Sequence, residues 1–207
     1  MAPVQTTPLL ILLSAPSGAG KTTVCQQVLR QNPSIVRAIT CTTRKPRPGE
    51  SDGVDYYFHT PESFHARIAE NAFLEHATVF GNSYGTLKSE VLDKLARGFD
   101  VLLNIDVQGA ESVRRQAAAD AVLAKALVTV FLTPTSLGEL EARLRNRGSE
   151  SETVLQHRLS IAREEIAHNT HFDYLILSQT REDDLRRMQS IIDAEKLRRH
   201  RVFMPAV

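Results

Sequence analysis

The stretch Leu9-Leu10-Ile11-Leu12-Leu13-Ser14-Ala15-Pro16-Ser17-Gly18-Ala19-Gly20-Lys21-Thr22-Thr23 decides the fold. Its five aliphatic residues predict a buried parallel strand, and a loop of small residues follows directly. Val24, Val28 and Leu29 then recur at helical spacing, which predicts a helix that opens near Lys21. A strand, a glycine-rich loop, Gly-Lys-Thr and a helix make a P-loop, where backbone N–H groups and a helix N-terminus bind phosphate oxygens.

The P-loop predicts a role for each of its residues. Gly18 and Gly20 let the backbone approach an anion closely. We expect Lys21 to reach the β- and γ-phosphates of a nucleoside triphosphate, and the Thr22 hydroxyl to be a ligand of Mg2+. Ala15 departs from the simplest motif, which has glycine there, and a positive φ at this position would disfavour its methyl group. The expected ATP-binding residues are Ala15, Pro16, Ser17, Gly18, Ala19, Gly20, Lys21, Thr22 and Thr23. A glycine-rich turn that merely caps a helix is the alternative, but it leaves the buried strand and the Gly-Lys-Thr order unexplained.

Composition excludes several classes of protein. With 207 residues, of which 42% are hydrophobic, the chain can bury a sizeable core, and we expect one domain. The 25 basic and 24 acidic residues nearly cancel, so we expect no general binding to nucleic acid or to a membrane surface. Cys25 and Cys41 cannot form a disulfide framework or a zinc site by themselves. The first residues lack a basic segment, and their apolar run is too short for a signal peptide or membrane span, so we expect a cytoplasmic protein.

Strands that alternate with helices predict an α/β fold with a parallel sheet covered on both faces. The expected core strands are 9–13, 35–41, 101–106, 128–132 and 174–177. Helices are expected to end before Gly98, to span 109–119, 153–169 and 182–200, and to begin at the cap Ser136. Segment 37–86 does not fit this alternation, and we interpret it as an inserted lobe with strands at 54–59 and 73–79, a helix at 61–70 and a turn at 81–86.

A second group of residues suits an anion. Two prolines and a glycine exclude a regular helix from the stretch between Thr40 and Glu50, which therefore forms a loop that carries three cations. Arg44 and Arg47 in this stiff loop can bind an anion with the planar fork of their guanidinium groups. We expect Tyr56 and Tyr84 at turns or strand edges, where phenol hydroxyls can bind phosphate, although each alone could be a surface or core aromatic. Together with the P-loop, these residues indicate a phosphorylated acceptor.

Several motifs are similar to those of one family. Residues 15–23 resemble the P-loop of guanylate kinases, and Thr42-Thr43-Arg44-Lys45-Pro46-Arg47-Pro48-Gly49-Glu50, followed by Gly53, Asp55-Tyr56 and Phe58, resembles their GMP-binding segment. Further similar motifs are Phe73-Leu74-Glu75, Gly81-Asn82, Tyr84-Gly85-Thr86, Ile105-Asp106-Val107-Gln108-Gly109, Arg143-Leu144 and Arg147-Gly148. The likeness runs from about Leu9 to the last helix.

The resemblance implies a three-layer P-loop kinase fold with a parallel core sheet, an inserted mixed-β GMP-binding lobe and a helical lid. It divides the single domain 1–207 into a core of 9–36, 87–135 and 170–207, a GMP-binding lobe of 37–86 and a lid of 136–169. The implied reaction is the ATP-dependent phosphorylation of GMP, and of dGMP, in purine nucleotide metabolism. ATP and GMP are then the small-molecule partners and Mg2+ the cofactor, and the oligomeric state stays open.

The resemblance also implies roles by position. The implied GMP-binding residues are Thr40, Arg44, Arg47, Glu50, Tyr56, Glu75, Tyr84, Gly85, Thr86, Asn104 and Asp106. Asp106 would also hold Mg2+ through water. The implied catalytic residues are Lys21, Arg44, Arg143, Arg147 and Arg158, of which the last three would be lid arginines. Two positions depart from the family pattern, because Asn104 stands where an acidic residue is usual and Ser178 where an asparagine is expected near adenine.

Two other functions fit parts of the pattern. The first is a kinase of another small phosphorylated acceptor, such as a ribose bisphosphate, and the arginine–tyrosine group with Glu75 argues against it. The second is an interaction module that resembles guanylate kinases but has lost catalysis. Those modules lack an intact P-loop, whereas Gly20-Lys21-Thr22 is complete here.

Overall fold

A five-stranded parallel sheet forms the centre of the computed structural model, which describes residues 6–79, 81–146 and 151–203. The strand order is β2-β7-β1-β8-β9, and every neighbouring pair is parallel. The strands are β1 (Leu10–Ser14), β2 (Ile35–Arg37), β7 (Asp100–Asn104), β8 (Leu127–Pro134) and β9 (Tyr174–Ser178). The aliphatic run becomes the central strand β1, and all five of its residues are buried because helices cover both faces.

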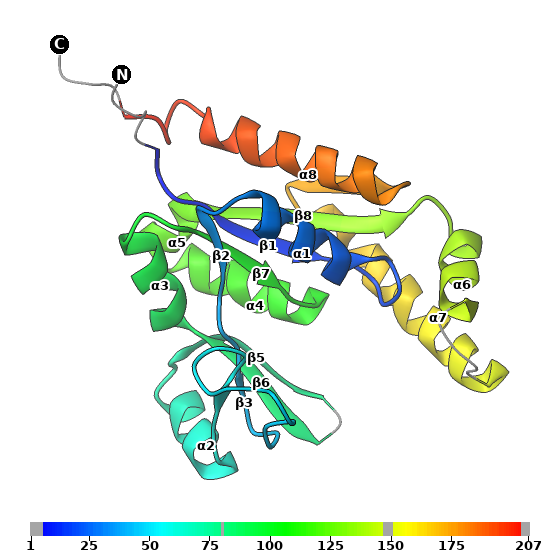
Figure 1. The fold of residues 1–207 in the computed structure, drawn as a ribbon, viewed down its shortest axis with the longest axis horizontal. Helices are drawn as coiled ribbons and strands as arrows, with labels where there is room; N and C mark the ends of the chain where they lie inside the picture. The colour runs from blue at the N-terminus through cyan, green and yellow to red at the C-terminus, as the bar shows by residue number, and fades with distance from the viewer. Residues whose placement is uncertain (1–5, 80, 147–150, 204–207) are drawn as a thin grey trace.

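Two helical layers sandwich this sheet (Figure 1). On one face lie α1 (Lys21–Gln31) and α8 (Arg181–Lys196), whose Val28 and Met188 pack against Ile11 of β1. The other face is covered by three helices, α3 (Lys88–Ala96), α4 (Val107–Ala118) and α5 (Ala121–Ala126). The α/β fold class and its three layers are therefore confirmed.

A smaller mixed sheet forms a lobe beside the core, and we call residues 41–87 the β lobe (Figure 1). Its strand order is β4-β3-β6-β5, in which β3 and β4 are parallel and the other pairs antiparallel. Its elements are β3 (Cys41–Thr42), β4 (Tyr57–Phe58), α2 (Pro61–Ala69), β5 (Phe73–Val79) and β6 (Asn82–Leu87). The rings of Phe64 and Phe73 stack at 4.4 Å and form a small separate core with Cys41.

A pair of helices projects from the core after β8 (Figure 1). These are α6 (Leu137–Arg145) and α7 (Glu152–Ala167), which we call the helical arm; the 3-10 turn η1 (His168–His171) follows. Leu140 and Leu144 pack against Leu155 and Leu159 and hold the two helices together. As predicted, Ser136 caps α6, and its hydroxyl accepts from the Glu139 N–H at 3.1 Å.

The structure corrects several element boundaries. The strand expected at 35–41 is two strands in different sheets, because the chain crosses from the core to the β lobe between Arg37 and Cys41. The turn expected at 81–86 is mostly β6, which pairs with both β5 and β3. Of the strand expected at 54–59, Tyr57 and Phe58 form β4, and Tyr56 makes an isolated bridge with Asp52. The helix α5 was not expected, and α8 ends at Lys196 rather than at residue 200.

Glu90 of α3 fixes the crossing between the core and the β lobe. Its carboxylate accepts from the Ile39 N–H at 2.8 Å and from the Tyr57 hydroxyl at 3.1 Å, and Lys94 pairs with it. On the return crossing, the Lys88 N–H donates to the Ala72 carbonyl at 2.9 Å. The orientation of the β lobe therefore depends on these polar contacts together with the burial of Leu74 of β5 in one apolar cluster with Val91 of α3 and Val113 of α4.

The two ends of the described chain meet beside α8. Thr6 and Val202 form an antiparallel bridge, and the Thr7 N–H donates to the Arg201 carbonyl at 2.8 Å. Arg201 is buried and lies 3.2 Å from the carboxylate of Glu195. Residues 6–8 are thus held against the core. Within residues 6–79, 81–146 and 151–203, no helix is both long enough and apolar enough to cross a bilayer.

Gly85 tests the packing of β6 against β5. A Cβ atom at this position would lie 2.9 Å from both the Glu75 carbonyl oxygen and Phe73 Cδ1, so Gly85→Ala must displace the sheet. We expect overpacking to cost about 1–3 kcal/mol, which for a chain of this size lowers Tm by about 2–12 °C. Thermal unfolding measures this shift. Gly138→Ala in α6 is the control, because its nearest neighbour would be Ser136 Oγ at 3.9 Å, and an equal loss there would contradict the explanation.

Candidate active site

The loop between β1 and α1 has the geometry that its sequence predicts. Gly18 and Gly20 have φ values of 93° and 100°, and Gly20 is the N-cap of α1. A Cβ atom at Gly18 would lie 2.7 Å from Leu144 Cδ2, so glycine also permits the close approach of α6. Ala15 is buried and, unlike Gly18 and Gly20, does not have a positive φ. Its methyl group is therefore compatible with the loop.

Lys21 reaches back across the edge of the sheet. Its Nζ donates to the Ile105 carbonyl oxygen, just beyond β7, at 2.6 Å. Burial lowers the pKa of Lys21, while the nearby Asp106 carboxylate acts in the opposite direction. Asp106 is the N-cap of α4, and its Oδ1 accepts from the Gly109 N–H at 2.7 Å. The loop encloses a pocket of about 320 Å³ lined by Ala15, Pro16, Ser17, Gly18, Gly20, Lys21, Thr22, Thr23, Asp106 and Glu165.

The helical arm contributes arginines that contact this loop. Arg143 Nη1 donates to the Ala19 carbonyl at 3.2 Å and to the Ser178 hydroxyl at 3.0 Å, and its Nη2 pairs with Glu139 at 2.5 Å. Arg158 Nη2 donates to the Ser17 hydroxyl at 2.8 Å. The third predicted arm arginine, Arg147, lies outside the described residues. Two arginines of the arm are thus at the loop.

A second pocket lies on the other side of Gly18 and Gly20. It has a volume of about 410 Å³ and is lined by residues of the loop, α1, the arm and the start of α8, including Arg143, Asn146, Ser178, Thr180, Arg181 and Asp184. The Ser178 hydroxyl donates to Asp184 Oδ2 at 2.7 Å, and the Gln179 N–H donates to Oδ1 at 3.1 Å. Ser178, the residue that departs from the family pattern, therefore lies in a hydrogen-bonded wall of this pocket.

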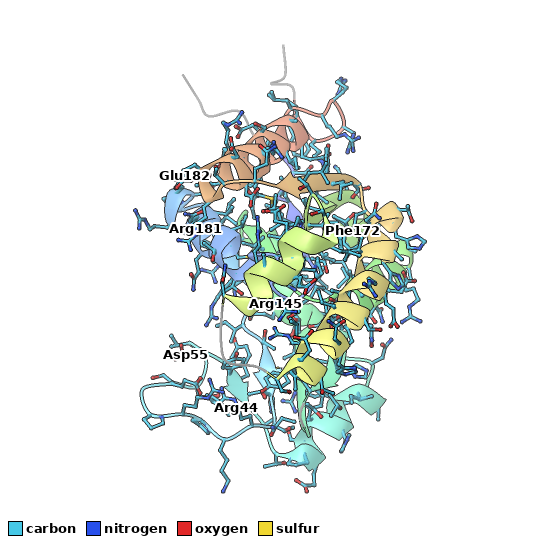
Figure 2. All side chains as sticks on the ribbon, turned by 90° about the vertical axis from the view of Figure 1, so that its right-hand side faces the viewer. Arg44, Asp55, Arg145, Phe172, Arg181 and Glu182 are labelled. Carbon is cyan, nitrogen blue, oxygen red and sulfur yellow. The ribbon has the colours of Figure 1, made fainter. Side chains whose placement is uncertain are left out.

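In the β lobe, the Glu50 carboxylate contacts the side chain of Arg44 and the backbone of Arg47, the two residues expected to bind an anion. Arg44 Nη2 lies 2.9 Å from both oxygens of Glu50, and the Arg47 N–H donates to Glu50 Oε2 at 2.8 Å. The N–H of Arg47, followed by the Arg44 guanidinium, lowers the pKa of Glu50. The Arg44 guanidinium also lies 5.3 Å from the ring centre of Tyr56, and Tyr56 and Tyr84 meet edge to face at 6.3 Å. Figure 2 shows Arg44 in the β lobe, far from Arg181 at the start of α8.

A third pocket joins the β lobe to the core. It has a volume of about 260 Å³, and its lining includes Thr22, Thr40, Tyr56, Thr86 and Asn104. Glu75 does not line this pocket directly but contacts it through Thr86, whose hydroxyl donates to Glu75 Oε1 at 2.7 Å. Burial raises the pKa of Glu75, against the opposing effect of this hydrogen bond.

The structure thus places many of the predicted residues around three pockets, whereas Glu75 lines a fourth, of about 370 Å³, together with His76 and with Ser112 and Arg115 of α4. Thr40, Tyr56, Thr86 and Asn104 come together at the joint between the β lobe and the core, whereas Arg44, Arg47, Glu50 and Tyr84 lie beyond it in the lobe. Gly85 lies behind Thr86, within β6. Sequence reasoning missed Glu165, which belongs to α7 and lines the loop pocket. Glu165 stands seven residues, or two helical turns, after the predicted arm residue Arg158, so helical spacing is the signal that separates it from its neighbour Glu164.

A phosphate-binding loop between a buried strand and a helix, a mixed β insertion and a helical arm together define the P-loop kinase fold. Comparison with known proteins then identifies the family. A family model described as "Guanylate kinase" matches residues 7–195. The chain belongs to the guanylate kinase family.

Individual relatives agree with this assignment. The guanylate kinase of Hydrogenovibrio crunogenus is 46% identical over 187 residues, which are 90% of this chain and 88% of the relative. The guanylate kinase of Paramagnetospirillum magneticum is 42% identical over 193 residues, which are 93% of this chain and 87% of the relative. The crystal structure of guanylate kinase from Anaplasma phagocytophilum has a TM-score of 0.72 and 30% identity, and the match covers 97% of this chain and 92% of that one.

The buried Glu75 makes stability depend on pH. Folding raises the pKa of this carboxyl above its ordinary value of 4.5, so its contribution to stability is present below that value and is lost as pH rises through the folded pKa. We therefore expect Glu75→Gln to raise Tm by about 2–4 °C near pH 8, the shift for about 1 kcal/mol, and the gain to shrink toward about pH 5. Thermal unfolding across this range measures it. The same change at the exposed Glu164 is the control, and a Glu75→Gln gain independent of pH would contradict the cause.

Proposed function

We propose that the protein transfers the γ-phosphoryl group of ATP to GMP, and also to dGMP, and forms ADP and the nucleoside diphosphate. The observation that carries this proposal is the presence of two separate anion-binding groups. One is the P-loop with Lys21, and the other is the arginine–tyrosine group of the β lobe with Arg44 and Tyr56. A donor and an acceptor that both carry phosphate need two such groups, and membership of the guanylate kinase family supports the same reaction.

For the donor, the proposal assigns the triphosphate to residues 15–23. The core, 9–36, 87–135 and 170–207, would carry the ATP site, and the lid, 136–169, would bring Arg143, Arg147 and Arg158 over it. Contacts of Arg143 with Ala19 and of Arg158 with Ser17 support this assignment, because they place two cations at the loop. The adenine end would lie toward Ser178 in the adjoining pocket.

For the acceptor, the proposal assigns the GMP phosphate to Arg44, Arg47, Tyr56 and Tyr84 in the lobe 37–86, and Glu50 would hold Arg44 in place. Guanine presents N1–H and N2–H2 as adjacent donors, which one carboxylate can accept together. Thr40, Thr86 and Asn104 line the pocket between the lobe and the core, and Glu75, which lies behind Thr86, would accept these donors. Adenine has a lone pair at N1, so the same carboxylate would repel it.

In the proposed reaction, an oxygen of the GMP phosphate attacks the γ-phosphorus of ATP. A new O–P bond forms while the bond to the β–γ bridging oxygen breaks, and ADP leaves. The chain needs no side-chain nucleophile, because the GMP phosphate is already an anion. Its work is positioning and neutralisation of charge: Lys21 and the lid arginines would face the transferred group, and Arg44 would hold the acceptor in line.

The donor set fits Mg2+ as a cofactor that arrives with the nucleotide. The Thr22 hydroxyl and the Asp106 carboxylate line the same pocket as Lys21, and both supply the oxygen ligands that Mg2+ prefers. In the described part of the chain, no cluster of three or more His, Cys, Asp or Glu could hold a metal, so phosphates and water would complete the coordination. When bound, Mg2+ neutralises developing charge on the phosphates. We place this activity in cytoplasmic purine nucleotide metabolism.

An acceptor screen tests the function. A coupled assay measures ADP formation with GMP, dGMP, AMP and ribose phosphates as acceptors. We expect fast turnover with GMP and dGMP only. Glu75→Gln should lower kcat/KM for GMP by about tenfold to a hundredfold, the range for a hydrogen bond to a charged group, and weaken discrimination against AMP. Asn104→Asp is the companion variant and should keep its GMP activity. Preference for a sugar phosphate, or no turnover with any acceptor, would overturn the proposal.

The planar guanidinium group of Arg44 allows a test of the proposed GMP site in the β lobe. Arg44→Lys keeps the charge but loses the planar pair of donors, so we expect KM for GMP to rise roughly tenfold while KM for ATP stays nearly constant. Steady-state kinetics with each substrate varied in turn measures both constants. Arg30→Lys on the exposed side of α1 is the matched control and should change neither. An equal rise in KM for ATP would assign Arg44 to the donor site.

A further inference from the structure

The helical arm places a carboxylate against the P-loop. Glu165 Oε2, from α7, accepts from the backbone N–H of Ser17 at 3.2 Å, although the two residues are far apart in the sequence. The side chain is half-buried and lines the pocket that also contains Lys21 and Asp106. A backbone N–H of a phosphate-binding loop is a group that the fold directs at anions, and in this structure its acceptor is an anion of the chain itself.

A second contact joins the same two elements at the same residue. Arg158, two turns before Glu165 on α7, donates from Nη2 to the Ser17 hydroxyl at 2.8 Å. The arm is therefore attached to Ser17 by one acidic and one basic side chain. The surroundings of Glu165 act on its pKa in opposite directions. Burial raises the pKa, the Ser17 N–H and the Lys21 cation lower it, and the Asp106 carboxylate raises it.

We propose that Glu165 is a positioning residue that competes with the triphosphate for the Ser17 N–H and so couples the arm to ATP binding. One N–H cannot serve the Glu165 carboxylate and a phosphate oxygen equally, and the two anions repel each other within one pocket. ATP must therefore displace Glu165, which releases the acidic contact and leaves Arg158 to face the phosphates. The inference rests on the proposed function only in taking residues 15–23 as the ATP-phosphate site.

This role belongs to Glu165 rather than to acidic residues of α7 in general. Glu164 is adjacent on the same helix and has the same charge, but its side chain is exposed and it does not line the pocket. Glu164→Gln therefore removes the same charge from the same helix without touching the Ser17 contact. The comparison between the two positions separates a local competition from a general change in electrostatics.

Calorimetric titration with ATP and Mg2+, without any acceptor, tests the competition directly. We expect Glu165→Ala to bind ATP about five- to tenfold more tightly than wild type, because the chain no longer has to give up a hydrogen bond to a charged group. Glu165→Gln should bind more tightly as well, but by less, since its amide oxygen can still accept from Ser17. The affinity for AMP, which lacks β- and γ-phosphates, should stay unchanged in both variants. Glu164→Gln should match wild type for both nucleotides.

Amide hydrogen exchange gives a second readout that does not depend on a ligand. The Ser17 N–H should exchange faster in Glu165→Ala than in wild type, and at the wild-type rate in Glu164→Gln. Circular dichroism and Tm verify that each variant is folded.

Three results would overturn the inference: ATP affinity unchanged or weaker in both Glu165 variants, equal tightening for AMP, or an equal effect of Glu164→Gln. Failure of wild type to bind ATP would overturn the proposed function together with the competition. Unchanged affinity of the Glu165 variants in a protein that binds ATP would overturn the competition alone.

Discussion

The parallel pairing of β1 with β7 is the constraint on which the other parts of the molecule depend. Its register places Leu13 beside Asn104, so the P-loop and Asp106 leave the sheet at the same edge. Lys21 then links the start of α1 to the residue just after β7 by donating to the Ile105 carbonyl. A buried ammonium needs such a partner, because its desolvation would otherwise be too costly. The phosphate-binding pocket is thus a product of strand register as much as of the loop itself.

The β lobe and the helical arm show one common electrostatic arrangement. In the lobe, the Glu50 carboxylate pairs with Arg44 and accepts from the Arg47 N–H. In the arm, Glu165 accepts from the Ser17 N–H in the pocket of Lys21. Both the loop of Arg44 in the lobe and the P-loop thus contain a donor that is engaged by a carboxylate of the same chain. Such pairing limits the cost of concentrating cations and oriented N–H groups around one active centre.

Local sequence was sufficient to predict the central strand and the P-loop, but it was insufficient to predict strand pairing in the β lobe and the contact of the helical arm with the P-loop. An aliphatic run followed by Gly-rich residues specifies β1 and the P-loop within fifteen positions of the sequence, so both were predictable. The segment 81–86 has the composition of a turn, but its pairing with β5 and β3 makes it a strand, and that pairing is not local. Placement of Glu165 against Ser17 also depends on tertiary packing, because helical spacing puts Glu165 on the face of Arg158 but does not show that this face meets the P-loop.

The bridge between Thr6 and Val202 has a consequence for the topology of the chain. Both ends lie at the corner of the core opposite the helical arm and away from the β lobe (Figure 1). A short linker could therefore join residue 6 to residue 202 without passing any of the three pockets, and the chain could be opened at an exposed loop instead. The order of elements along the chain could thus be circularly permuted while the spatial order β2-β7-β1-β8-β9, which sets the phosphate-binding edge, is retained.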